Sequence, residues 1–319
     1  MKNLIVLALV TGVFGYFGAK FYLHHSVSSG LDDALLMASP FADIQYTGVS
    51  STMSGELSID GIKVRMSGFD DPLYIDKLSI ITPGFFYLLK LNDLGQSGPD
   101  FEIPDTFGFS ADGMRASTSA DYVRKIYDLG MEQTNASDLE DVAAVCAGKY
   151  GFSPETLREL GYNNLIVSMR IAYRQDDKNL FVDVNADVED MYGIDMTVKL
   201  ADRLTPETLM RGNYRPRLSE GRLEYVDYSL NSRTAKLCAQ AGLSDSEIQM
   251  AQLDAFSASG LENGIEFDEY VVEPFKEFLN GKSTFIITAK PNEPINLSQI
   301  DLYKPSDVPA LLNLTGEVL

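Results

Sequence analysis

The chain has 319 residues, of which 45% are hydrophobic and 23% are charged, so it is long and apolar enough to bury a sizeable core. Its net charge is −20, from 46 acidic and 26 basic residues. A surface this acidic repels phosphate backbones and anionic headgroups. The composition therefore argues against a nucleic-acid-binding protein and predicts an acidic globular body.

The first 25 residues predict a transmembrane anchor. Leu4–Leu23 is an apolar run of 20 residues that holds only one charge, Lys20. As a helix it would span about 30 Å, the hydrocarbon thickness of a bilayer. The alternative is a cleaved signal peptide, but cutting after Ala19 would place Phe17 where a small residue is expected. We therefore expect a single-pass protein with its body outside the cytoplasm.

Small residues recur along this segment at spacings of four, three and four: Ala8, Gly12, Gly15 and Ala19. These spacings put them on one helix face, where another helix could approach closely. The alternative is that glycine and alanine are simply common in membrane helices. The contact-face interpretation favours a scaffold or assembly factor that acts through its membrane helix.

Residues 26–40 resemble a juxtamembrane linker with a short helix, and 41–319 form the body, with a possible sub-boundary near 92–120. The run 56–66 predicts a hairpin turning at Asp60-Gly61, with Glu56 opposite Arg65. The hairpin would place four apolar residues on one face: Leu57, Ile59, Ile62 and Val64. A single strand with a glycine bulge is the alternative. Further on, 73–81 predicts a strand and 85–91 a short helix.

Helices are predicted within 121–161, and then the alternation of apolar and polar residues predicts a three-stranded antiparallel meander over 165–200. Its apolar face includes eight candidate residues: Val167, Met169, Ile171, Val182, Val184, Ile194, Met196 and Val198. A strand at 222–228, helices within 231–281 and a strand at 283–291 complete an α+β fold. Either those helices cover the apolar face, or part of it stays open and cradles an acyl chain.

The two cysteines, Cys146 and Cys238, are too far apart in sequence for a CxxC motif. In an oxidising compartment they could form a disulfide that closes a loop of about 90 residues. The alternative is that both are small buried hydrophobic residues.

Catalytic and cofactor motifs are lacking in the sequence. The two histidines, His24 and His25, lie beside the predicted membrane helix, so a Ser-His or Cys-His site in the body would require them to fold back. The sequence has no histidine–cysteine cluster for zinc, and the acids Asp183 and Asp187 lie on the polar sheet face. We expect a non-enzymatic protein without cofactor or metal; a carboxylate-dependent hydrolase remains the other possibility.

A short N-terminal anchor followed by Gly55, Leu57, Ile59, Gly61, Ile62 and Val64 in the pattern G-x-L-x-I-x-G-I-x-V resembles the start of bacterial AsmA-like envelope proteins. The resemblance covers about 60 residues; the later helical segments depart from it. It implies an inner-membrane anchor, a periplasmic body with apolar β-structure, and a role in lipid transport or envelope maintenance. The expected partners are the membrane, a lipid ligand and a membrane or periplasmic protein.

Overall fold

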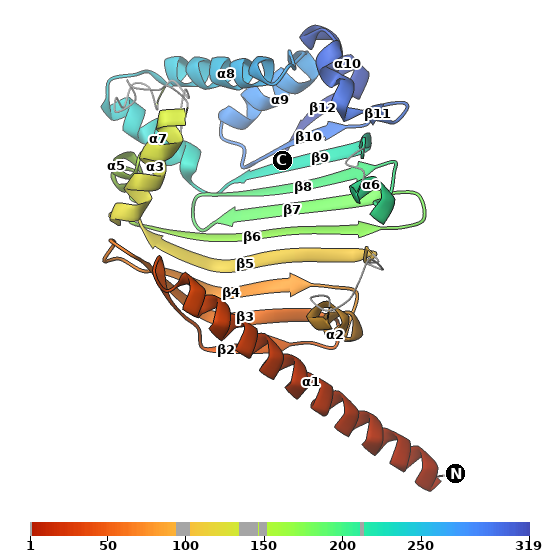
Figure 1. Ribbon diagram of the computed structural model, residues 1–319. Helices are drawn as coiled ribbons and strands as arrows, with labels where there is room; N and C mark the ends of the chain where they lie inside the picture. Colours follow the sequence, from red (N-terminus) through yellow and green to blue (C-terminus); the bar gives the residue numbers. More distant parts are fainter. Residues whose placement is uncertain (1, 94–102, 134–145, 147–151, 211–213) are drawn as a thin grey trace. The chain divides into compact units, whose positions relative to one another are not determined.

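The computed structural model describes residues 2–93, 103–133, 146, 152–210 and 214–319. Its side chains are described except those of residues 2–18, 34, 91–93, 130–133, 209–210 and 301. The fold is α+β, as predicted, with antiparallel strands and several helices (Figure 1). The chain divides into two compact units, unit 1 (Met1–Gly113) and unit 2 (Met114–Leu319). This division lies within strand β5 (Thr106–Ser117) and inside the interval 92–120 considered from the sequence.

Helix α1 in unit 1 runs unbroken from Lys2 to Ala38. The short helix expected before Pro40 is therefore present as the end of α1, whereas the flexible linker expected just after residue 25 is helical. Serine and glycine at 26–30 are weak helix formers, but tertiary packing outweighs such propensities. Val27 packs against a buried cluster made by Leu23 of α1 with Phe85 and Leu88 of α2 (Phe85–Asp93). Among the residues with described side chains, no helix is long and apolar enough to cross a membrane.

The sheet of unit 1 is antiparallel: β1 (Ala42–Gln45) and β2 (Gly48–Ser51) both pair with β3 (Glu56–Met66), which pairs with β4 (Leu73–Ile81). The predicted strand at 73–81 and helix near 85–91 are therefore confirmed. The predicted hairpin at Asp60-Gly61 is wrong, because β3 is one strand whose pairing register with β4 is the same on both sides of Gly61.

Gly61 breaks the strand locally without turning it. Its φ is 61°, a conformation that favours glycine, and a Cβ atom there would lie 2.6 Å from Oγ1 of Thr47. The Thr47 hydroxyl and amide both donate to the carbonyl of Asp60, at 2.7 and 2.9 Å. The Asp-Gly pair thus makes room for Thr47, which lies between β1 and β2. The same pair predicted a hairpin turn from the sequence, and that prediction was misleading.

Unit 2 has a second antiparallel series, in the order β6-β7-β8-β9-β10-β12, with β11 beside β9. Its strands are β6 (Asn164–Gln175), β7 (Leu180–Val188), β8 (Tyr192–Leu200), β9 (Arg217–Asp227), β10 (Thr284–Ala289), β11 (Ile295–Asn296) and β12 (Leu314–Val318). Its helices are α3 (Asp121–Gln133), α5 (Pro154–Glu159), α6 (Pro206–Met210), α7 (Leu230–Gln240), α8 (Asp245–Glu262), α9 (Glu269–Leu279) and α10 (Val308–Leu312), with 3-10 turns η1 (Leu297–Leu302) and η2 (Pro305–Asp307).

The predicted meander is confirmed as β6, β7 and β8. Val182 lies opposite both Tyr173 and Val198, and Val184 lies opposite both Ile171 and Met196. Because directly opposed residues share a sheet face, the alternating apolar residues of all three strands gather on one side.

Helices α5 and α7 lie at one end of the strands of unit 2, and α9 and α10 lie beside the last strands, β10 and β12 (Figure 1). Two clusters pack helices on the apolar face. At one end, Leu157 of α5, Leu160 at the C-terminus of that helix and Leu237 of α7 pack with Val188. At the other, Val271 and Phe278 of α9 and Leu312 of α10 pack with residues that include Leu180, Leu200 and Phe285. The main core of unit 2 therefore lies between α9, α10 and the last strands.

Candidate functional site

Between these two helical clusters, the apolar face of unit 2 carries residues that belong to neither. We call them the central strip: Met169, Ile171, Val184, Ala186, Ile194, Met196 and Leu223. They form two adjacent rows across the strands, one of which runs from β6 through β7 and β8 to β9. The strip is therefore an apolar surface made only by strands, and the pairing register of the strands determines which residues form it.

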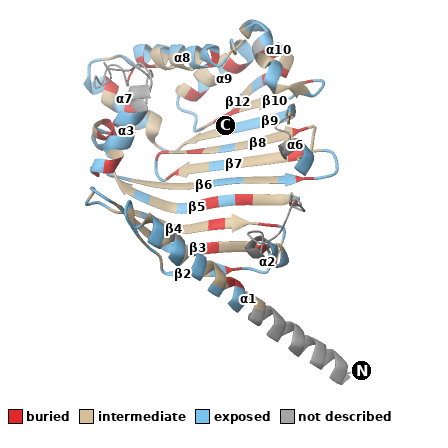
Figure 2. Cartoon of the chain, viewed as in Figure 1, coloured by how far each residue is buried: buried red, intermediate tan, exposed pale blue. Residues whose placement is uncertain are grey.

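The central strip is only partly shielded from solvent. Ile171 is 46% exposed and Leu223 37% exposed, and the other members are half-buried. By contrast, Leu180 and Val188, at the two ends of β7, are buried. Figure 2 shows the strands of unit 2 mainly in the colours of intermediate and exposed residues. For the described residues, the two sequence alternatives both hold in part: helices cover the ends of the apolar face, and its centre stays accessible.

The four apolar residues predicted to share a face in unit 1 do not do so. Leu57 lies opposite Ile80, whereas Ile62 lies opposite Ile75, and these two partners have opposite parity in β4. Leu57 and Ile59 therefore face one side, where Leu57 contacts the α1–α2 cluster, and Ile62 and Val64 face the other. The prediction failed because it depended on the hairpin.

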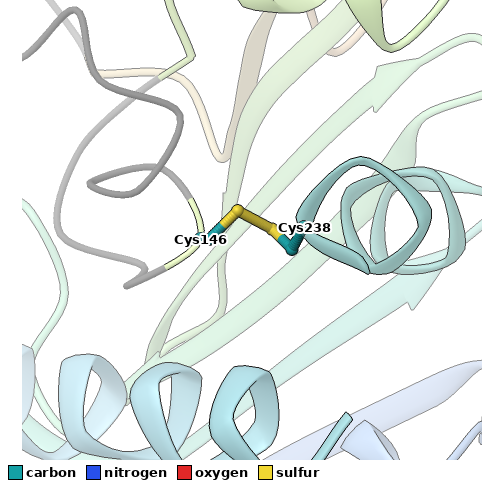
Figure 3. Close-up of a disulfide and its surroundings, with 2 residues drawn as sticks. All are labelled: Cys146 and Cys238. Atoms are coloured by element: carbon teal, nitrogen blue, oxygen red, sulfur yellow. A yellow bond between two sulfur atoms is a disulfide. The ribbon is translucent and has the colours of Figure 1, made fainter. Parts of the chain in front are cut away.

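The structure joins Cys146 and Cys238 in a disulfide (Figure 3). Their Cα atoms are 5.7 Å apart, and both residues are almost fully buried beside Ile248. Cys238 lies in α7, so the bond fixes the chain near residue 146 to a helix that also covers one end of the apolar face. Of the two alternatives left open by the sequence, the structure has the bridge.

The predicted contact face of the N-terminal helix lies largely outside the described side chains. Of its four residues, only Ala19 is described, and it packs against the Leu23, Phe85 and Leu88 cluster inside unit 1. This member therefore contacts another helix of the same chain.

One histidine does fold back onto the body. The Nε2 atom of His24 lies 2.8 Å from Oγ of Ser51 at the end of β2. Ser51 is only 6% exposed, which disfavours it as a nucleophile for a bound substrate. Burial, and then the nearby positive charge of Lys20, lower the pKa of His24 from its ordinary value of 6.5. We interpret the pair as a contact that seats α1 on the sheet.

This lowered pKa predicts an acid-sensitive contact. The neutral ring is favoured in the folded state, so the contribution of His24 to stability is complete above pH 6.5 and falls as the pH drops through its lower folded pKa. The protection factors of the α1 amides, which are corrected for the intrinsic pH dependence of exchange, should therefore fall between pH 7 and pH 5. His24→Gln, which cannot titrate, should flatten this difference; an equal pH effect in the variant would contradict the assignment.

A polar cluster on the sheet of unit 1 was missed from the sequence. Glu56 pairs with Lys77, not with Arg65, and its carboxylate also accepts the hydroxyls of Ser58 and Ser79. The hydrogen bond from Lys77 holds the pKa of Glu56 below its usual range, and the same contact raises the pKa of Lys77. A lysine so strongly held in its charged form is a poor general base, so we interpret the cluster as structural.

The opposite, polar face of unit 2 carries a groove of about 410 Å³ that includes Asp183 and Asp195. Asp183 accepts a hydrogen bond from Thr197 at 3.1 Å, and Asp195 one from Asn185 at 3.5 Å. Asp187 similarly accepts the hydroxyl of Tyr228 at 2.7 Å. These acids act as cross-strand partners, and no observed geometry favours a paired-carboxylate reaction among them.

A second depression of about 520 Å³ lies where α7, α8 and the end of α9 meet β9 and β10. Asp227 lines this depression and is half-buried, and burial raises the pKa of its carboxyl group. The backbone amide of Asn231 donates a hydrogen bond to the carboxylate at 2.9 Å, which opposes this shift only in part. That bond joins the carboxylate to the first turn of α7, a helix-capping arrangement. The best-placed acid of this depression therefore has a structural partner.

Comparison with known proteins gives one family model, described as an uncharacterized protein, which matches residues 185–318. The matched segment begins in β7 and continues through β8, β9 and the helices that cover the last strands. No curated protein matches the chain.

Proposed function

We propose that this chain is a non-enzymatic envelope protein, held at the bacterial inner membrane by Leu4–Leu23, whose periplasmic body binds an acyl chain of a lipid on the central strip. The observation that carries the proposal is the accessible apolar centre of a sheet face whose ends are covered by helices. Apolar surface of this kind is favourably buried by an apolar ligand.

Three observations support the location. Leu4–Leu23 has the length and apolarity of a membrane span, and α1 keeps its backbone helical throughout this range. The disulfide between Cys146 and Cys238 is typical of an oxidising compartment. The resemblance of the first strands to AsmA-like proteins agrees with a lipid-related role at this membrane.

The size of the strip favours a lipid over a protein partner. It crosses four strands, or three strand spacings of about 4.8 Å, and is about two residues wide along each strand. The area between its outer Cα positions is therefore on the order of 100 Å². A stable protein interface buries roughly 800 Å² per partner, so the strip alone is several times too small for one. One acyl chain lying across the strands fits these dimensions better.

The test uses two strip residues that are exposed and should tolerate polar substitution, Ile171 and Leu223. The double variant Ile171→Gln, Leu223→Gln should lose roughly 2 kcal/mol of apolar contact, or about 30-fold in affinity for a fluorescent phospholipid. The full-length protein, extracted in mild detergent, is titrated with that lipid, and native mass spectrometry records what it already carries.

The matched control is Ile126→Gln, Leu261→Gln, which alters exposed residues on α3 and α8. Its affinity should equal that of the unmodified protein. A clean apo mass together with equal titration curves for both double variants would refute the strip as a lipid site.

A further inference from the structure

A second exposed apolar surface lies in unit 1, around the middle of α1. We call it the tip patch: Phe21, Tyr22, Met53 and Phe86. These side chains are 74%, 55%, 66% and 78% exposed, respectively. They come from α1, from the turn between β2 and β3, and from the first turn of α2. Exposed aromatic residues from two helices, together with a methionine from the turn, mark an interaction surface.

The three elements are held together beneath the patch. Leu23 of α1 is buried against Phe85 and Leu88 of α2, next in sequence to the exposed Tyr22 and Phe86. The amide of Phe85 donates to the carbonyl of Met53 at 3.3 Å.

The turn itself is fixed to the start of α2. The amide and hydroxyl of Thr82 donate to the carbonyl of Gly55, at 2.9 and 2.8 Å. Gly55 has a φ of 92°, and a Cβ atom there would lie 2.5 Å from the amide nitrogen of Gly84. Such a close backbone approach requires glycine. These contacts fix the turn to the start of α2, so that Met53 and Phe86 keep constant positions relative to each other.

The charge around the patch differs in sign from that of the whole chain. Residues 19–31, 52–55 and 82–92 contain no aspartate or glutamate, in a protein of net charge −20, and the acids Asp32, Glu56 and Asp93 follow directly after them. The same segments contain two lysines, Lys20 and Lys90. The local charge of these segments therefore suits the anionic headgroups of a membrane.

We propose that the tip patch lies in the headgroup layer of the bilayer, so that unit 1 rests on the membrane beside its own anchor. The inference depends on the proposed membrane span. If Leu4–Leu23 fills the hydrocarbon, then Phe21 and Tyr22 lie at its edge, where aromatic side chains are favoured. Phe85 packs against Leu23 and therefore lies at the same depth in the bilayer as Leu23. Phe86 follows Phe85 in the chain, and Met53 is hydrogen-bonded to Phe85, so both lie near that depth as well.

The chain contains no tryptophan, so one introduced indole reports its own surroundings. We would compare the full-length variants Phe86→Trp and Phe41→Trp in phosphatidylethanolamine–phosphatidylglycerol vesicles with brominated acyl chains, which quench buried indoles. Phe41 is the matched control, because it is 77% exposed but follows the end of α1. The 15 residues from Leu23 to Ala38 correspond to about 22 Å of helix, and Phe41 follows Ala38 in the chain.

In the vesicles, Phe86→Trp should emit at shorter wavelength than Phe41→Trp and should be quenched at least about threefold more, since interfacial side chains insert by roughly 5–10 Å. Flotation of the vesicles tests the anchor separately. If both variants float but Phe86→Trp is quenched no more than Phe41→Trp, the tip patch is not in the bilayer, while the anchor stands. If neither floats, the anchor and the tip patch are both refuted.

Discussion

Removing the disulfide should lower the free energy of unfolding of unit 2 by about 4–5 kcal/mol. The bond joins residues 92 positions apart, and in the chain-entropy model a loop of this size constrains the unfolded chain by that amount. The variant to measure is Cys146→Ala, Cys238→Ala, because alanine leaves no unsatisfied hydroxyl in a site that is at most 1% exposed. Urea denaturation, followed by circular dichroism, gives the change.

The control is chemical reduction. Dithiothreitol should shift the denaturation midpoint of the unmodified protein and leave that of the double variant unchanged. Alkylation adds a cellular measurement: since the chain has only two cysteines, protein extracted without reductant should take up no label. Two labelled thiols in that material, or equal midpoints with and without the bond, would refute a structural disulfide and weaken the proposed location outside the cytoplasm.

Phe278→Ala should cost about 3–5 kcal/mol, the second-largest effect we expect. Phe278 of α9 is 3% exposed and joins the covering helix to the sheet. Its ring lies 5.6 Å from that of Tyr225 in β9 and 5.9 Å from that of Phe285 in β10, between centroids. Truncation would leave a cavity between α9 and strands β9 and β10.

Tyr270→Ala is the matched control, because Tyr270 lies in the same helix and is 65% exposed. Its free energy of unfolding should stay within about 0.5 kcal/mol of the unmodified value. Similar losses for the two variants would mean that α9 is not seated on the sheet through Phe278.

Both predictions concern the supports of the central strip. Cys238 lies in α7 at one end of the apolar face, and Phe278 lies in the cluster at the other end. Lipid binding should weaken in each variant only as far as the protein unfolds, whereas the strip variant should bind less lipid while staying folded. This separation distinguishes a binding surface from its scaffold.

The sequence by itself determined the meander of unit 2, because strand periodicity is a local property. In β6, β7 and β8 every second residue is apolar, and a one-residue slip in register would turn this whole set to solvent. Helices were likewise expected within 231–281, and α8 begins there with a capping box between Ser244 and Glu247, a signal that needs only four consecutive residues. Strand β5 was missed, although Phe107 and Phe109 alternate with smaller residues in it.

Tertiary structure alone decided the features that depend on distant partners. Asp60-Gly61 has the local signal of a turn, but the segment is a single strand, because Thr47 donates to the carbonyl of Asp60 and β4 pairs with β3 on both sides of Gly61. Whether the apolar face is covered depends on where α7 and α9 pack, and helix placement is set by contacts such as Phe278 with Phe285. Composition and periodicity describe which surfaces are apolar; only the packing of remote segments decides which of them remain accessible.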